Sequence, residues 1–133
     1  MKMISALRQW YHDWSTQGER AAEKVFAGRV ALSDDEFFEL HFVDGSVLKE
    51  VAIGVRRVFV EHVPLDMRRL APDDNFAREL QFVWSYDSLA DVELLLDVEK
   101  RFQVSFSEAE GSEIVTMGAL IRLVDQKVKA RTS

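Results

Sequence analysis

Three long apolar runs repeat at the spacing of an α-helix, and this periodicity constrains the fold of the chain more than any other feature. Apolar side chains recur three or four positions apart in residues 46–63, 89–102 and 117–128. The first run is rich in β-branched residues, which a strand also accepts, but its length and spacing favour a helix. Because a helix of this kind must bury its apolar face, we expect an all-α protein in which helices cover one another.

Residues 1–45 carry helical signals of their own. A helix with an aromatic face is expected over residues 3–17, and a shorter helix over residues 19–28, which end in glycine. Ser33 and Glu36 have the spacing of a capping box at the start of a further helix. We therefore predict that this part of the chain is a helical extension.

Further caps and breaks mark the rest of the chain. Ser46 is expected to cap the first long run and Pro64 to end it. A long loop is expected over residues 64–79, and a loop with one helical turn over residues 105–114. Thr116 is expected to cap the last helix, whose basic tail suits a helix C-terminus.

Composition narrows the functional classes. With 133 residues, 47% of them apolar and 30% charged, the chain has the composition of one modest globular domain. Its net charge of −6 argues against nucleic acid as a ligand and suits a partner with a basic docking surface. No apolar stretch approaches the length of a membrane span, and we expect a cytoplasmic protein.

Residues that would carry catalysis or bind a metal are scarce. The chain has no cysteine, which excludes disulfides and thiolate metal sites. Its three histidines, His12, His41 and His62, lie far apart and lack metal-ligand spacing. Neither a glycine-rich phosphate loop nor a nucleophile elbow is present. We therefore expect no metal site and no enzyme activity.

Ser88 stands directly before the second apolar run, and Asp87 precedes it. A serine in this position is most often an N-cap, and a carboxylate beside it favours the positive end of the helix dipole. A capping hydroxyl at the start of a helix is also an exposed hydroxyl, so capping does not exclude a second role. Taken alone, the residues leave both roles open.

The neighbourhood of Ser88 resembles the acyl carrier protein family. The match runs from Asp87 to about Val124 and begins with Asp-Ser-Leu, followed by a periodic helix, an acidic turn and a last helix. Upstream, residues 54–80 look like the first helix and long loop of the family. The resemblance therefore covers about residues 46–130.

The resemblance implies a fold and a function. The fold would be a four-helix carrier bundle over residues 46–133, with residues 1–45 as an additional extension. In the family, the serine of Asp-Ser-Leu bears 4′-phosphopantetheine, so Ser88 would be the covalent attachment site, flanked by Asp87 and Leu89. The protein would tether acyl intermediates as thioesters for fatty acid, polyketide or related biosynthesis. Its partners would be a phosphopantetheinyl transferase and the enzymes that load and transfer acyl groups.

Acidic residues gather around the same motif. Residues 73–99 contain eight acidic side chains against the single base Arg78, so most of the negative charge of the chain lies there. An acidic helix face often serves solvation alone, but beside this motif we favour docking to a basic partner. The expected docking residues are Asp91, Glu93, Asp97 and Glu99. The apolar stripe of the same helix, which includes Val92 and Leu96, is expected to be core.

Two features depart from the family. Residues 81–86, QFVWSY, occupy a link that is usually much shorter, and residues 1–45 have no counterpart in the minimal carrier domain. Since large aromatic side chains rarely lie wholly in water, we hypothesise that the extension folds back onto the carrier domain and that Phe82 or Trp84 anchors the lengthened link. The alternative function is a carrier-fold interaction module without a prosthetic group, in which Ser88 is only a cap.

Overall fold

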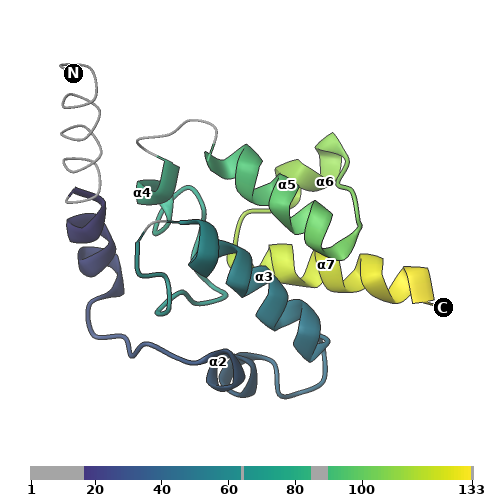
Figure 1. Cartoon of the computed structure of the whole chain (residues 1–133), viewed down its shortest axis with the longest axis horizontal. Coiled ribbons are helices and arrows are strands. Elements are labelled where there is room, and N and C mark those ends of the chain that lie inside the picture. Colours follow the sequence, from purple (N-terminus) through teal and green to yellow (C-terminus); the bar gives the residue numbers. More distant parts are fainter. Residues whose placement is uncertain (1–16, 64, 85–89, 133) are drawn as a thin grey trace, which may run out of the picture.

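The computed structural model describes residues 17–63, 65–84 and 90–132 (Figure 1). Within these residues the regular elements are all helices, and the one β-feature is an isolated bridge between Asn75 and Thr116. The all-α prediction is confirmed, while the helix expected over residues 3–17 lies largely outside the described part. The elements are a helix over residues 17–26, α2 (Asp34–His41), α3 (Lys49–His62), α4 (Gln81–Trp84), α5 (Ala90–Phe102), α6 (Glu108–Glu113) and α7 (Met117–Thr132).

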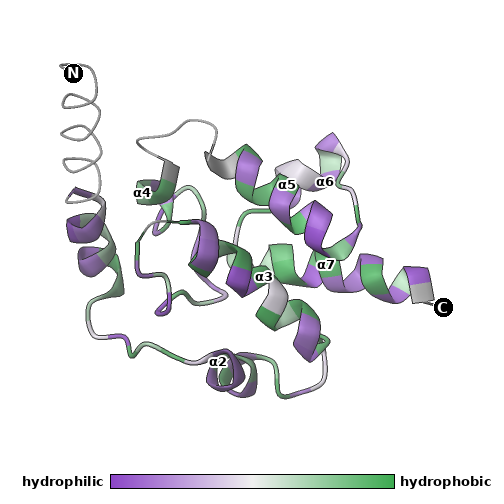
Figure 2. Ribbon diagram, viewed as in Figure 1, coloured by the Kyte–Doolittle hydropathy of each residue, from purple (hydrophilic) through white to green (hydrophobic). Residues whose placement is uncertain are grey.

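Helix α3 lies at the centre of the fold and packs against α2, α5 and α7. Its predicted stripe is confirmed, since Val51, Val55, Val58 and Phe59 are all buried. The apolar and polar residues alternate along α3, α5 and α7 as expected of amphipathic helices (Figure 2). The core therefore surrounds α3.

The start of α3 differs from the prediction. Ser46 does not cap the helix, because its amide and hydroxyl both donate to Asp44 in the preceding turn, at 3.1 and 2.8 Å. The helix begins after Leu48, whose amide donates to the Asp125 carboxylate of α7 at 2.9 Å. Asp125 is buried and also pairs with Lys129 at 2.7 Å. The carboxylate of Asp125, which is distant in the sequence, thus accepts an amide at the start of α3, the role that the sequence predicted for Ser46.

The described part of the extension shares the hydrophobic core of the rest of the chain. Phe26, Phe37 and Phe42 are fully buried in that core. The ring of Phe26 meets Phe82 edge to face, with centroids 5.8 Å apart, and Phe82 is itself buried. For residues 17–45, the hypothesis that the extension folds back is therefore confirmed, and Phe82 anchors the lengthened link.

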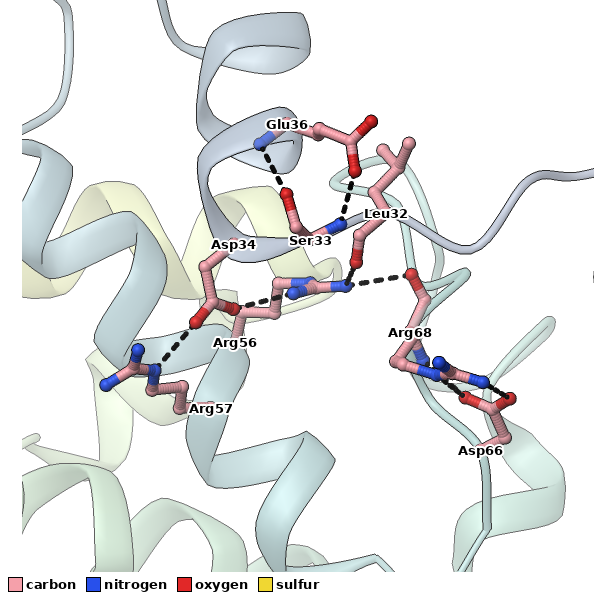
Figure 3. Close-up of polar contacts among 8 residues, drawn as sticks. All are labelled: Leu32, Ser33, Asp34, Glu36, Arg56, Arg57, Asp66 and Arg68. Carbon is pink, nitrogen blue, oxygen red and sulfur yellow. Dashed lines mark hydrogen bonds and ion pairs between the residues drawn. The ribbon is translucent and has the colours of Figure 1, made fainter.

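A buried arginine ties the extension to α3. Arg56 is 2% exposed, and its guanidinium donates to Asp34 at 2.7 Å and to the carbonyl oxygens of Leu32 and Arg68 (Figure 3). Arg57 reaches the other oxygen of Asp34 at 2.7 Å from a half-exposed position. Partial burial opposes ionisation of Asp34, but the hydrogen bonds from the two arginines outweigh it and lower the pKa of this carboxyl.

A second ion pair joins the extension to the long loop. Arg29 donates to both oxygens of Asp74, at 2.8 and 2.9 Å, and this hydrogen bonding raises the pKa of the guanidinium. Asp74 is 2% exposed and also accepts the amide of Ala71 at 2.8 Å. The bidentate geometry fixes the loop against the extension.

Replacing Arg56 should test how far the fold depends on this contact. Arg56→Ala should lower the free energy of unfolding by about 3 kcal/mol or more, because one carboxylate and two carbonyl groups lose a buried donor. Arg57→Ala is the matched control and should cost less than about 1 kcal/mol, since the same carboxylate is contacted from the surface. Urea unfolding followed by circular dichroism measures both, and equal losses would contradict the assignment.

Gly54 sets the distance between α3 and α5. A Cβ at this position would lie 2.5 Å from Cζ of Phe102. Gly54→Ala should therefore destabilise the protein by about 1–3 kcal/mol through overpacking. Gly111→Ala, in α6, would meet no atom within 4 Å and should be neutral or stabilise by up to about 1 kcal/mol. Thermal unfolding of both variants gives the comparison. An unchanged melting temperature for Gly54→Ala would show that α3 and α5 have room for a methyl group at this position.

Candidate functional site

The candidate site lies at the start of α5. Asp87, Ser88 and Leu89 fall outside the described residues, whereas α5 is described from Ala90, two positions after the serine. The backbone amides of a helix start, together with the helix dipole, favour a phosphate group attached nearby. The described surroundings of the site are therefore α5 from Ala90 onward and the elements that pack against it.

The outer face of α5 carries apolar side chains that the sequence analysis expected in the core. Val92 is 49% exposed and Leu96 is 50% exposed, and they lie one turn apart. The buried residues of α5 are instead Leu94 and Val98. The expected stripe also included Leu95 and Phe102, which are partly buried against the core. The expectation was wrong for Val92 and Leu96 because the buried face of α5 is centred on Leu94 and Val98, and Val92 and Leu96 lie on the other side of the helix.

The acidic residues of α5 do not form one uniform face. Asp91 belongs to α5, but its side chain lies outside the described part, and Glu93 is exposed. Asp97 approaches His62 of α3, with 3.6 Å between Oδ2 and Nδ1. Glu99 accepts the amide of Phe106 at 2.9 Å and so holds the loop that follows α5. This internal role of Glu99 was not foreseen.

Glu93, Asp97 and Glu99 nevertheless line one hollow together with the exposed Leu96. It is a shallow, open depression on the outside of α5, lined by Glu93, Leu96, Asp97, Glu99, Lys100 and Val104. The structure thus brings together three of the four predicted docking residues. It also adds an apolar centre, which the sequence analysis missed.

An apolar cavity lies on the inner side of α5. Its volume is about 230 Å³, and it is lined by Phe59, Phe76, Ala77, Leu94, Leu95, Gly111 and Ile114. The rings of Phe59 and Phe76 stack with centroids 5.9 Å apart and planes 11° from parallel. For comparison, an engineered apolar cavity of about 150 Å³ holds benzene. The cavity is large enough for a short acyl segment or a single ring.

Helix α6 borders this cavity through Gly111, and polar contacts hold both its start and its link to α7. None of its residues is buried, and it begins with a capping box between Ser107 and Glu110. Glu110 also pairs with Lys127 of α7 at 2.8 Å. The hydrogen bond from Lys127, followed by that from the Ser107 amide, lowers the pKa of Glu110. Because α6 buries so little apolar surface, we expect it to open more readily than α3.

The described residues offer neither a metal site nor a membrane span. No group of three His, Cys, Asp or Glu side chains there is arranged to hold a metal ion. None of the described helices has both the length and the apolar character needed to cross a membrane.

The cavity should bind small apolar molecules. Benzene should shift the NMR signals of the methyl groups of Leu94 and Leu95, because a largely apolar cavity of this size can accept such a ligand. Ala77→Trp should abolish the shifts by filling the mouth. Ala109→Trp is the matched control, since Ala109 is exposed on α6 and does not line the cavity. Shifts spread evenly over the protein, or equal in both variants, would contradict a defined site.

Comparison with models of known protein families gives no match, and no solved structure matches the chain significantly. The functional assignment therefore depends on the residues and geometry described above.

Proposed function

We propose that the protein is a discrete acyl carrier protein that bears 4′-phosphopantetheine on Ser88. The observation that carries this proposal is the apolar cavity beneath α5, which opens beside the helix that begins two residues after the serine. Leu94 and Leu95, which line it, lie about 6–8 Å along α5 from Ala90, its first described residue, given a rise of about 1.5 Å per residue. When bound, the arm supplies the thiol that holds an acyl group as a thioester.

The chain's own residues divide the work of such a carrier. Ser88 provides the attachment hydroxyl at the head of α5, where helix amides favour the phosphate. Phe59 and Phe76 form one wall of the cavity, which suits an apolar cargo withdrawn from water. No acid, base or nucleophile of the protein is required, because the partner enzymes perform the chemistry.

The outer face of α5 fits the docking step. Val92 and Leu96 offer an apolar centre, and Glu93 adds negative charge beside it. Interfaces commonly combine an apolar core with a charged rim that steers encounter. We propose that the transferase and the acyl-loading and acyl-transferring enzymes bind this face through a basic surface, in the cytoplasm.

The four helices of the proposed carrier bundle are α3, α5, α6 and α7, and α4 belongs to the lengthened link. In this proposal the extension holds the link and the long loop in place, through the contact of Phe26 with Phe82 and the pair of Arg29 with Asp74. The extension would thereby keep the loop that carries Phe76 against the cavity.

Coexpression with a broad-specificity phosphopantetheinyl transferase tests the proposal. The intact mass should rise by one phosphopantetheine group, and Ser88→Ala should abolish the addition while the circular dichroism spectrum stays that of the wild type. Loss of a cap costs only about 1 kcal/mol. Ser85→Ala is the control and should be modified normally. An unchanged mass with several transferases would overturn the proposal and favour an interaction module in which Ser88 is only a cap.

A further inference from the structure

A second hollow lies at the opposite end of α5 from the proposed attachment site. It is an open groove of about 950 Å³, where the C-terminal ends of α5 and α7 meet the first turns of α3. Its apolar lining includes Leu48, Val51, Ile53, Phe102 and Val128. Because α5 has 13 residues, the groove lies about 20 Å from the start of that helix.

The charged lining of the groove is mostly basic. Lys49, Arg57, Arg101 and Arg131 line it, against the single acid Glu50. The chain as a whole has a net charge of −6, so this basic lining is opposite in sign to the protein. A local excess of positive charge over an apolar floor is the complement of an acidic, partly apolar ligand.

Two of the arginines are placed to receive a carboxylate. Arg131 donates to the carbonyl oxygens of Phe102 and Gln103, at 2.7 and 2.8 Å, and these contacts hold it in position without neutralising its charge. The left-handed backbone of Gln103, with φ of 53°, ends α5 at this point. The carboxylate of Glu61 lies 3.8 Å from Arg101, at the outer limit of an ion pair.

The remaining two cations are engaged in surface ion pairs. Lys49 pairs with Asp35 at 3.0 Å and Arg57 with Asp34 at 2.7 Å, and both cationic side chains are about half exposed. Exposed pairs of this kind contribute only about 0–1 kcal/mol, so they offer little resistance to an incoming carboxylate. The pairs therefore reduce the basic character of the groove without removing it.

We propose that this groove binds an acidic peptide segment of a partner protein. A large apolar side chain of the peptide packs on Ile53 and Phe102, and neighbouring carboxylates pair with Arg101 and Arg131. An open groove with cations from three helices suits an extended chain with several acidic residues. A nucleic acid or an anionic membrane would extend beyond the groove and meet the negative charge of the rest of the protein, whereas a short peptide contacts the basic groove alone.

Selection from a library of random short peptides tests the proposal on the full-length protein. The enriched peptides should be acidic and contain at least one large apolar residue, and their affinity should fall with added salt. A selection that enriches nothing above a blank surface, or that enriches neutral or basic peptides, would overturn the proposal.

Two variants locate the binding. Arg101→Glu should weaken a selected peptide about tenfold, as measured by fluorescence anisotropy. Its matched control is Lys100→Glu, an identical change of charge at the next residue, which lines the outer depression of α5 instead of the groove. Ile53→Asn should also weaken binding, and circular dichroism checks that each variant is folded. Equal affinities for Arg101→Glu and Lys100→Glu would place the peptide elsewhere.

Ser88→Ala should leave the affinity for the peptide unchanged. The peptide-binding result is therefore independent of whether Ser88 carries phosphopantetheine.

Discussion

The fold depends on a positive charge placed in its core. Arg56 lies in the middle of α3, and a guanidinium buried there is tolerated only where acceptors surround it. Those acceptors come from two other parts of the chain: Asp34 and Leu32 from the extension, and Arg68 from the long loop. If the extension left α3, the buried guanidinium of Arg56 would lose the acceptors Asp34 and Leu32. Residues 17–45 therefore belong to the folded unit.

The long loop connects the extension to the candidate site through a series of contacts. Asp74, held by Arg29, accepts the amide of Met117 at the start of α7 through its own carbonyl oxygen. One residue further on, Asn75 forms the bridge with Thr116, and the amide of Phe76 donates to the carbonyl oxygen of Val115 at 3.0 Å. The ring of Phe76 is thereby held against Phe59 at the wall of the cavity. The extension and the cavity are thus linked by a continuous series of contacts.

Local signals in the sequence predicted local structure well. The capping box at Ser33, the cap by Thr116 and the buried stripe of α3 all appear as expected, because each depends on residues a few positions apart. Features that depend on distant residues were not predictable in this way. Only the fold brings Asp125 to the start of α3, assembles the cavity from three helices and the long loop, and turns Val92 and Leu96 outward. The acidic residues of α5 could be picked out from charge alone, but the internal role of Glu99 depends on the loop that returns to it.

The contact between Leu48 and Asp125 has a consequence for how the chain folds during synthesis. The two residues are 77 positions apart, and Asp125 belongs to α7, which leaves the ribosome after the other described helices. Until α7 has emerged, the first turn of α3 lacks the carboxylate that accepts its leading amide, and the central helix of the core stays incomplete at that end. Domains of this size generally fold as units. In this protein the central helix is therefore completed from the C-terminal side, and nascent chains that stop before α7 will hold an unfinished α3.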